Sequence, residues 1–417
     1  MQLTQCITAY AASDCRAAEK ERKDYLRRMT DTAKIDASVL RQKYALILLC
    51  KTLCAIPAPS HQEKKRADFI RRWLIAAGGE QTVIDSAQNV LLPFRCEESN
   101  AITLFMAHTD TVFPDMEPIA VTERDGKLFA PGIGDDTSNV AILMMLVRML
   151  LQSGAEPENG VLFAFNSCEE GLGNLKGCRR IMDDYAGRIK EVISFDGYYD
   201  SICNRAVGSA RYRVEVKTKG GHSYAAFGNV SAIHILSAMI TTLYTLKLSS
   251  ETDRTTYNAG CISGGTSVNT IAQQAEMLFE YRSDKKEGMD RMKQFFDSVI
   301  QAYRSMEAEI NTTLLGERPC MGMVDPAAEA ALTIKAAECI KAVTGIEAPE
   351  KASSTDCNIP FSLGIPAVSF GLLNGGGAHT REEWVEIDSL CAGMEIGRRL
   401  IFPYFGLSPA ANDTPNI

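Results

Sequence analysis

Short apolar runs that alternate with helical patterns occupy most of the chain. Five of these runs are apolar on both faces of a strand, which is typical of strands buried between two helix layers in a mostly parallel sheet. They are Val90–Phe94, Ala101–Ala107, Val161–Asn166, Val192–Phe195 and Ala367–Phe370. Lys64–Ala77 has the spacing of a helix that ends at Gly78-Gly79, and Asn139–Leu151 is apolar all round, which indicates a buried helix.

The middle of the chain has a different pattern. Arg211–Lys217 alternates between apolar and charged residues, which indicates a strand with one face in water. A helix, two strands, a helix and a strand follow, at Val230–Leu246, Thr255–Ser263, Gln274–Arg282, Lys286–Met306 and Glu307–Leu315. This β-α-β-β-α-β order is that of a ferredoxin-like module.

These patterns predict an α/β protein of two domains. The larger one has a mostly parallel sheet with helices on both faces and consists of residues 1–206 and 319–417. The smaller, ferredoxin-like α+β domain, residues 207–318, is inserted into it. We expect the charged residues 1–45 to form an outer helix or arm, and the Pro-, Ala- and Asn-rich tail from Leu407 to be loose.

Composition narrows the class of protein. Of the 417 residues, 46% are apolar and 23% are charged, which excludes a disordered chain, a collagen and a disulfide scaffold. The net charge of −8, with no basic cluster beyond Lys20–Arg28, argues against a nucleic-acid partner. Met1–Cys15 lacks the apolar core of a secretory signal, and the most apolar run, Val140–Leu151, is too short to span a membrane.

The cysteines indicate a compartment. Thirteen is an odd count, and no Cys-x-x-Cys motif is present. Free thiols in a reducing cytosol fit these facts better than a disulfide framework or a thiolate zinc site. We therefore predict a cytoplasmic location.

Possible metal ligands follow four of the five buried runs. In chain order these ligands are His108 with Asp110, the pair Glu169-Glu170, Asp196, and His379 after the glycines 375–377. A fifth candidate, Asp135-Asp136, lies in a glycine-flanked turn before the buried helix. Ligands in open α/β sheets bind at the carboxyl ends of strands, so the chain places two His and several carboxylates around one crevice.

Each of these motifs alone is common in turns and on surfaces. Together they put costly polar groups at the end of one buried strand after another, which a purely structural role does not explain. Two imidazoles and three carboxylates match a hydrolytic site with two zinc ions about 3.5–4 Å apart. One carboxylate would bridge the ions and another would act as general base, so Glu169 and Glu170 would have different roles.

Eight motifs make the sequence recognisable. They are MAHTDTVFP (106–114), GIGDDTSN (132–139), CEEGLGNLKG (168–177), SFDG (194–197), GGHS (220–223), GGTSVNTIAQ (264–273), SSTDCN (353–358) and GGGAHT (375–380). Over roughly Ala45–Leu400 the chain resembles the two-zinc exopeptidases and amidohydrolases that include peptidase T, carboxypeptidase G, aminoacylase and succinyl-diaminopimelate desuccinylase. It is most similar to peptidase T-like members. The resemblance implies that residues 207–318 are a dimerisation or lid domain.

The resemblance also implies the roles of the metal ligands. Asp135 matches the bridging ligand, His108 and Asp196 would complete one metal site, and Glu170 and His379 would complete the other. The family further suggests an unusual peptide geometry between Asp135 and the residue that follows it.

Three further residues match catalytic groups of the family. Asp110 matches the acid that orients His108, and Glu169 matches the general base that takes a proton from water and passes it to the leaving amine. His222 matches a His that reaches the partner subunit's active site and stabilises the oxyanion. A homodimer with composite sites is therefore expected.

Two residues match positions that hold the substrate in relatives. Arg282 would bind the substrate carboxylate, which suits the planar guanidinium, and Asn269 would bond to the same substrate end. His61 and His234 match no motif and are interpreted as structural, and the thiol of Cys168 is expected to pack at a strand end.

Two departures from the family pattern bear on the substrate. Thr137 stands where many relatives have Lys, although that position is not a ligand. The third carboxylate is Asp196, and in this family Asp there is typical of aminopeptidases and dipeptidases, whereas Glu is typical of deacylases and carboxypeptidases. The second departure favours a peptidase.

The sequence therefore predicts a metallo-exopeptidase that hydrolyses amide bonds of short peptides, an aminopeptidase or dipeptidase of the peptidase T type. An amidohydrolase that acts on N-acyl amino acids is the alternative. A third hypothesis is a non-catalytic homologue. The intact ligand set and Glu169 argue against it. The expected cofactors are two zinc ions per subunit, with manganese or cobalt as alternatives because availability often decides the metal at nitrogen and oxygen ligands.

Overall fold

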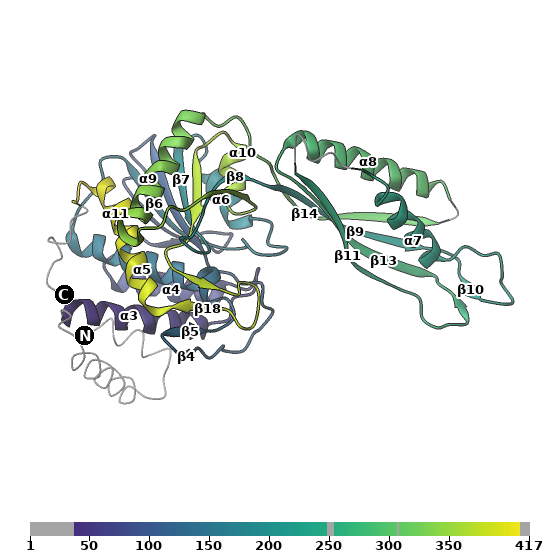
Figure 1. Ribbon diagram of the computed structural model, residues 1–417, viewed down its shortest axis with the longest axis horizontal. Coiled ribbons are helices and arrows are strands. Elements are labelled where there is room, and N and C mark those ends of the chain that lie inside the picture. Colours follow the sequence, from purple (N-terminus) through teal and green to yellow (C-terminus); the bar gives the residue numbers. More distant parts are fainter. Residues whose placement is uncertain (1–36, 248–253, 307, 409–417) are drawn as a thin grey trace. The chain divides into compact units, whose positions relative to one another are not determined.

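The computed structural model describes residues 37–247, 254–306 and 308–408 (Figure 1). Most of the predicted N-terminal arm and the end of the predicted loose tail lie outside the described residues. The chain divides into two compact units. The first includes the described residues up to Asn204, then Val324–Lys351 and the chain from Thr355 onward, and the second consists of Arg205–Met323 with Ala352–Ser354.

An eight-stranded sheet forms the middle of the first unit (Figure 1). Its strands, in spatial order, are β1 (Val83–Ile84), β2 (Val90–Phe94), β6 (Gly160–Asn166), β3 (Ile102–His108), β7 (Ile189–Phe195), β16 (Ala367–Phe370), β8 (Ile202–Ala206) and β15 (Glu350–Ser353). The pairs β6–β3, β3–β7 and β7–β16 are parallel, whereas β1–β2, β2–β6 and β16–β8 are antiparallel. The predicted mostly parallel sheet is confirmed, with antiparallel strands added at its sides.

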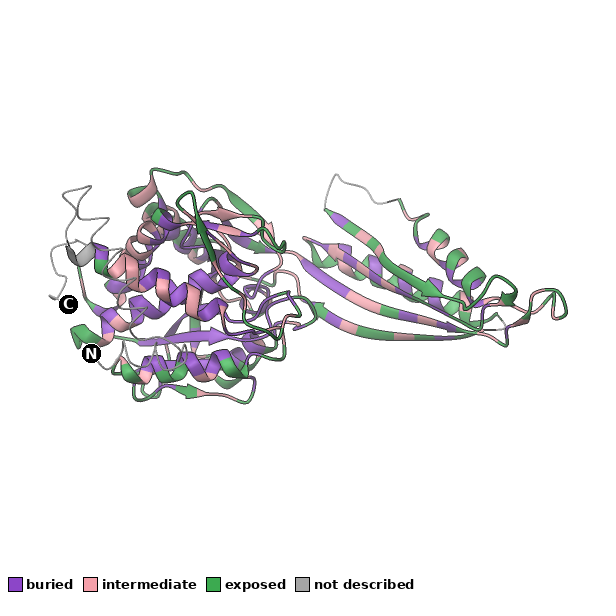
Figure 2. Cartoon of the chain, turned by 90° about the horizontal axis from the view of Figure 1, so that it is seen from below, coloured by how far each residue is buried: buried purple, intermediate pink, exposed green. Residues whose placement is uncertain are grey.

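Helices pack on the sheet through apolar side chains. They are α3 (Ala37–Cys54), α4 (Lys64–Ala76), α5 (Ser138–Ser153), α6 (Lys176–Asp184), α9 (Pro326–Thr344), α10 (Asn358–Ser362) and α11 (Ile387–Ile401). Phe105 and Ala107 of β3 join one core with residues of α3, α4, α5, α9 and α11. The intervening Leu104 and Met106 point to the opposite face, because successive strand residues alternate, and they are also buried. The central strands are therefore covered on both faces, as the buried colouring in Figure 2 shows.

Local signals set several helix ends. Asp325 accepts a hydrogen bond from the N–H of Ala327, and Pro326 opens α9. Gly345 and Gly154 end α9 and α5 in the left-handed conformation that glycine adopts without strain. Among the described residues, no helix combines the length and apolarity needed to cross a membrane.

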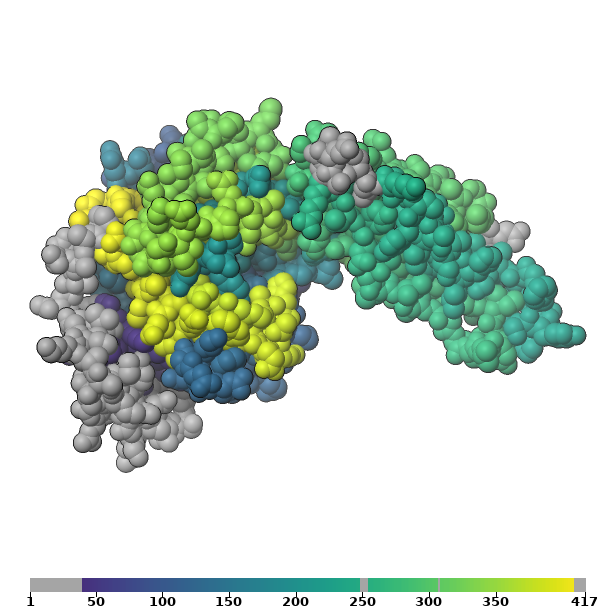
Figure 3. Space-filling view, in the orientation of Figure 1, coloured from purple at the N-terminus to yellow at the C-terminus, as the bar shows by residue number. Residues whose placement is uncertain are grey.

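A small antiparallel sheet joins two distant stretches of the first unit. Its order is β17 (Gly375–Gly376), β18 (Trp384–Glu386), β5 (Lys127–Phe129) and β4 (Thr122–Arg124). In Figure 3 the blue segment that contains β4 and β5 lies against the yellow segment that contains β18. This pairing brings the loop before β18 close to the chain that leaves β5.

The second unit is a four-stranded antiparallel sheet with two helices. Its strands, in spatial order, are β11 (Thr255–Gly264), β13 (Gln274–Ser283), β9 (Gly208–Lys217) and β14 (Glu309–Arg318), and its helices are α7 (Ala232–Leu243) and α8 (Lys286–Arg304). Val214, Phe279, Leu236 and Phe296 belong to the core between sheet and helices. The chain order β9-α7-β11-β13-α8-β14 confirms the predicted ferredoxin-like module. A two-stranded ribbon, β10 (Gly221–His222) with β12 (Thr270–Ile271), is added to it.

Candidate metal centre

The residues predicted as metal ligands meet at one edge of the central sheet. His108 is the last residue of β3, Asp196 follows β7 directly, and Glu170 comes four residues after β6. Because β6, β3 and β7 are parallel neighbours, their carboxyl ends lie at the same edge. Asp135 lies in a π-helical turn, η1, directly before α5, and His379 lies in the loop between β17 and β18.

Asp135 stands between the two imidazoles. Its Oδ1 lies 3.0 Å from Nε2 of His108, and its Oδ2 lies 3.1 Å from Nε2 of His379. The same Nε2 of His379 is 3.2 Å from Oε1 of Glu170. One carboxylate thus faces both imidazoles, which is the arrangement that a bridging ligand between two metal ions requires.

Asp196 is brought to the same cluster. Its carboxylate, a carboxylate oxygen of Asp136 and a ring nitrogen of His108 lie within 4.8 Å of one another. Both oxygens of Asp136 already accept hydrogen bonds, one from the N–H of His108 at 3.0 Å and one from Nδ2 of Asn139 at 2.6 Å. Asp136 therefore supports the backbone of β3, and Asp135 is left as the carboxylate between the imidazoles.

The backbone of η1 has a special conformation. The turn covers Ile133–Thr137, and Asp135 departs from helical geometry with φ −115° and ψ 86°. The Asp135–Asp136 peptide bond is cis, at the place where the resemblance implied an unusual geometry.

The electrostatics of the cluster fit cations. Burial raises the pKa of Glu170 to about 8, and the nearby carboxylate of Asp135 adds to the rise. Burial also raises the pKa of Asp196 to about 7, again with Asp135 as a neighbour. Although burial opposes it, hydrogen bonds from His108 and His379 hold the pKa of Asp135 below its usual range. Metal ions would relieve this crowding because they bind ionised carboxylates and neutral imidazoles, so the donor set fits metals.

Asp110 holds the loop that carries the two glutamates. Its Oδ1 and Oδ2 accept the N–H groups of Glu169 and Glu170 at 2.9 Å each, and Oδ2 also accepts the hydroxyl of Ser60 at 2.6 Å. Nδ1 of His108 lies 3.5 Å from the Asp110 carboxylate and 3.1 Å from its backbone oxygen. Asp110 therefore contacts His108, as the resemblance implied, and its two oxygens also hold the backbone of Glu169 and Glu170.

Glu169 is buried beside the ligand cluster. Neither of the two sets of possible ligand atoms that lie within 4.8 Å of one another includes its side chain. Burial is the main cause of the raised pKa values of Glu170 and Asp196, and the charge of Glu169 adds to both. Glu169 therefore lies near the predicted ligands, and its role as general base stays a prediction.

Three buried residues that sequence reasoning missed support the centre. Glu383, which is 0% exposed, accepts hydrogen bonds from the turn that carries Asp135. Arg66 donates to the backbone oxygen of Thr109 at 2.8 Å and lies 3.4 Å from the hydroxyl of Thr137. Asp356 accepts Nδ2 of Asn166 at 2.5 Å, at the end of β6. Glu383 lies four residues after His379 and Asp356 lies within SSTDCN, so only proximity to a motif could have indicated them.

The other predicted site residues lie in the second unit. His222 in β10 pairs with Thr270 in β12, and the N–H of Ser223 donates to the backbone oxygen of Asn269 at 3.0 Å, so Asn269 and His222 are neighbours. Arg282 in β13 donates through Nε and Nη2 to the two carboxylate oxygens of Glu280, at 3.1 Å each.

The residues interpreted as structural have simple surroundings. His234 is exposed on α7. The thiol of Cys168 is buried at the end of β6, 3.2 Å from Oε1 of Glu63 and 3.4 Å from Nδ1 of His61. Burial raises the pKa of this thiol to about 12, so it is a poor nucleophile.

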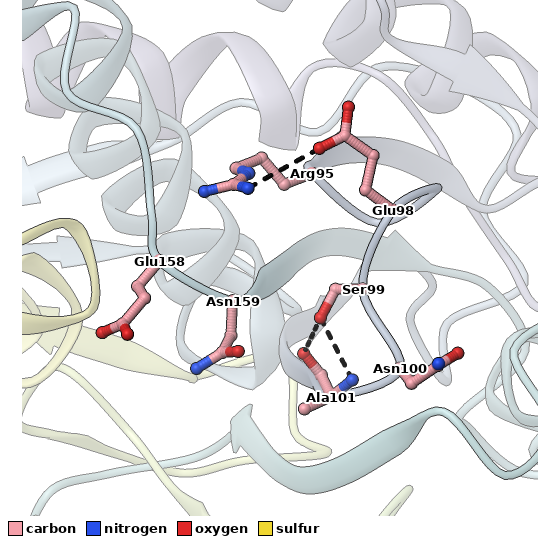
Figure 4. A pocket seen from close by; sticks show the side chains of 7 residues that line it. All are labelled: Arg95, Glu98, Ser99, Asn100, Ala101, Glu158 and Asn159. Carbon is pink, nitrogen blue, oxygen red and sulfur yellow. Dashed lines mark hydrogen bonds and ion pairs between the residues drawn. The ribbon is translucent and has the colours of Figure 1, made fainter.

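A pocket lies at the opposite edge of the sheet. It has a volume of about 410 Å³ and is lined by Arg95, Glu98, Ser99, Asn100, Ala101, Glu158 and Asn159 (Figure 4). Ala101 precedes β3 whereas His108 ends it, and seven strand residues span about 20 Å. The pocket is therefore separate from the ligand cluster.

Comparisons with known proteins agree with this geometry. A putative succinyl-diaminopimelate desuccinylase of Mycobacterium tuberculosis is 26% identical over 362 residues, which are 85% of this chain and 97% of that protein. The fold is similar to that of aminopeptidase PepT from Bacillus cereus, with a TM-score of 0.66, 20% identity, and coverage of 88% of this chain and 99% of that one. A dinuclear metal-binding peptidase from Bacillus subtilis has a TM-score of 0.56 and 18% identity, with coverage of 88% and 99%. The family model "Peptidase family M20/M25/M40" matches residues 104–402, and the chain therefore belongs to this family of metal-dependent peptidases and amidohydrolases.

Proposed function

We propose that the protein is a metallo-exopeptidase that hydrolyses amide bonds of short peptides, as an aminopeptidase or dipeptidase of the peptidase T type. The observation that carries the proposal is the position of Asp135 between Nε2 of His108 and Nε2 of His379, with Glu169 beside the cluster. The fold it shares with an aminopeptidase, and Asp rather than Glu at position 196, favour a peptide substrate.

Two metal ions would occupy the centre. His379, Glu170 and Asp135 would hold one ion. The family resemblance assigns His108, Asp196 and Asp135 to the other, and Asp135 contacts His108. We propose zinc, with manganese or cobalt as alternatives, because all three accept imidazole and carboxylate ligands. When bound, such ions lower the pKa of water toward about 7 and polarise the carbonyl of the substrate.

The chain's own residues would then move the protons. A carboxylate oxygen of Glu169 takes a proton from the attacking water and passes it to the leaving amine. Asp110 keeps the backbone of Glu169 in place through its N–H group. Nδ1 of His222 accepts from the N–H groups of Tyr224 and Ala225 at 3.2 and 3.3 Å, so the neutral ring carries its proton on Nε2. This tautomer supports the proposed role of His222 as a donor to the oxyanion.

The substrate end would be held by Arg282 and Asn269. Glu280 orients the guanidinium of Arg282 through Nε and Nη2. Among the described residues no hydrogen bond to its Nη1 is found, which leaves this nitrogen for a substrate carboxylate. As a homodimer the protein would combine His222 of one subunit with the metal centre of the other. A cytoplasmic location remains a prediction from the cysteine count.

The alternative is an amidohydrolase that removes an acyl group from an amino acid. The relative named as a desuccinylase favours it, because that similarity covers 85% of this chain. A non-catalytic homologue is the remaining possibility.

A substrate panel tests the proposal. Purified protein, treated with chelator and then reloaded with zinc, manganese or cobalt, is assayed on di- and tripeptides and on N-succinyl and N-acetyl amino acids. We expect metal-dependent release of the N-terminal residue from peptides, with slower turnover of the acyl compounds. Preference for acyl compounds would favour the alternative, and no hydrolysis in either panel with metals bound would revive the non-catalytic homologue.

A further inference from the structure

The carboxylate of Glu383 is enclosed by the turn that carries Asp135. Its Oε2 accepts the N–H of Gly132 at 2.7 Å, and its Oε1 accepts the N–H groups of Gly134 and Asp135, also at 2.7 Å. The residue is 0% exposed. A buried carboxylate costs free energy unless its oxygens are bonded, and here three backbone donors supply the bonds.

The turn is closed tightly around this carboxylate. A Cβ on Gly134 would lie 3.0 Å from Oε1 of Glu383 and 3.1 Å from the ring of Tyr198. Gly132 has φ +71°, and a Cβ there would lie 2.6 Å from the methyl group of Thr111. The backbone of residues 132–135 therefore has little room to move while Glu383 is in place.

Glu383 also connects two of the ligand loops. It lies in the same loop as His379, directly before β18, and its backbone oxygen accepts the N–H of Ala130 at 3.1 Å. The segment that supplies His379 is thus bonded to the segment that supplies Asp135, both before η1 and within it.

We propose that Glu383 is a positioning residue for Asp135. It fixes the N–H of Asp135 itself, and so keeps one oxygen of that carboxylate on each imidazole. In this way it joins the two metal positions into one coupled pair. The inference rests on the proposed two-metal centre, but not on the identity of the substrate.

The substitution Glu383→Gln removes one acceptor and places an NH₂ group against backbone N–H donors. The exposed neighbour Glu382→Gln is the matched control. Each chain is loaded with Mn²⁺, the affinities are measured by calorimetry, and the exchange coupling between the two ions is measured by electron paramagnetic resonance. We expect Glu383→Gln to weaken both Mn²⁺ affinities about 10- to 100-fold and to lose the coupled signal, since losing a residue that supports metal ligands has an effect of this size. Glu382→Gln should match the original protein.

Several outcomes separate this role from a structural one. If Glu383→Gln melts at a lower temperature yet keeps both affinities and the coupled signal, the proposal is overturned. Where that variant yields too little folded protein, Glu383→Asp keeps the charge but shortens the reach, and it should show the same loss of coupling. A wild-type chain that binds fewer than two ions would overturn the two-metal centre itself, whereas a coupled pair without peptidase activity would overturn only the proposed function.

Discussion

The buried carboxylates of the metal centre differ in what they can do because their hydrogen bonds differ. Asp110 accepts backbone N–H groups on both of its oxygens, and Asp136 accepts one such group on one oxygen. Both carboxylates therefore hold the backbone in place. Asp135 instead faces two imidazoles. Carboxylates of one chemical type therefore have different partners in this cluster, backbone N–H groups for Asp110 and Asp136 and imidazoles for Asp135.

Glu169 is expected to matter for the proton and not for the metals. The substitution Glu169→Gln keeps the shape of the side chain but removes the acceptor, so we predict retention of two metal ions and a loss of turnover of at least about 10³-fold. Metal content is measured by mass spectrometry and turnover on the best peptide of the panel. Replacing the exposed Glu117 by Gln is the control. A Glu169→Gln protein with near wild-type turnover would refute the assignment.

Glu329 predicts a pH dependence of stability away from the centre. It is buried in α9, its Oε2 accepts the N–H of Ala367 at 2.9 Å, and burial raises its pKa from 4.5 to about 7. The folded protein therefore holds this proton more tightly than the unfolded chain, so stability falls as the pH rises from about 4.5 to 7.

Glu329→Gln removes this titration while its amide oxygen still accepts from Ala367. As the pH rises from 5 to 8, the free energy of unfolding of the variant should increase by about 2 kcal/mol relative to that of the original protein. Thermal unfolding at both pH values measures the gain, and the exposed Glu338 of the same helix, replaced by Gln, is the control. An equal effect of Glu329→Gln at the two pH values would contradict the prediction.

The site residues at strand ends could be predicted from the sequence because burying a polar or charged side chain at the end of a buried strand costs free energy. His108, Glu170 and Asp196 all follow buried apolar runs, and the structure brings them together. Glu383 and Arg66 could not be predicted, since their partners lie 248 and 43 positions away along the chain. Nothing in the local sequence of either residue shows that it is buried.

At the scale of elements, apolar runs predicted five strands of the large sheet, and periodicity predicted the helices α4 and α5, whereas α6, α9, α10 and α11 were not predicted. The run Ala367–Phe370 coincides with β16, and Val90–Phe94 coincides with β2. The π-helical turn η1 and the short strands β17 and β18 have no such signal, and β18 depends on pairing with a distant strand, such as that of Trp384 with Phe129. These short elements are the ones that carry or flank Asp135 and His379.

The packing of α11 gives a prediction about two glycines. A Cβ on Gly393 would lie 1.5 Å from the backbone oxygen of Leu372, whereas a Cβ on Gly397 would lie 2.3 Å from the end of the Leu146 side chain. The backbone of Leu372 cannot move aside without displacing the segment after β16, whereas the side chain of Leu146 can change rotamer. We predict that Gly393→Ala lowers the free energy of unfolding by about 3 kcal/mol or more.

Gly397→Ala should stay within about 1 kcal/mol of the original protein, because the gain in helix propensity offsets part of the crowding. Melting temperature and soluble yield of the two variants give the comparison. The idea fails if Gly393→Ala is as stable as Gly397→Ala, because α11 would then be free to shift.

At the scale of the whole molecule, the chain keeps its candidate groups on two compact units. The metal cluster with Glu169 belongs to the first unit, and His222, Asn269 and Arg282 belong to the second. The ferredoxin-like module was predictable from the alternation in Arg211–Lys217 and from the order of the helices and strands that follow. Which groups of one subunit serve the centre of another could not be predicted from periodicity, and the proposed composite site rests on the family resemblance.

Subunit mixing tests the composite site. In a homodimer that combines Glu169 of one chain with His222 of the other, a heterodimer of Glu169→Gln and His222→Ala chains has one site with both groups intact. Equal mixing gives heterodimers in about half of the assemblies, so about a quarter of the sites, and of the wild-type activity, should return. Each variant alone should stay nearly inactive, and exchange is verified with differently tagged chains. Proven exchange without recovery, or a monomer in light scattering, would place His222 outside the catalytic site of a dimer.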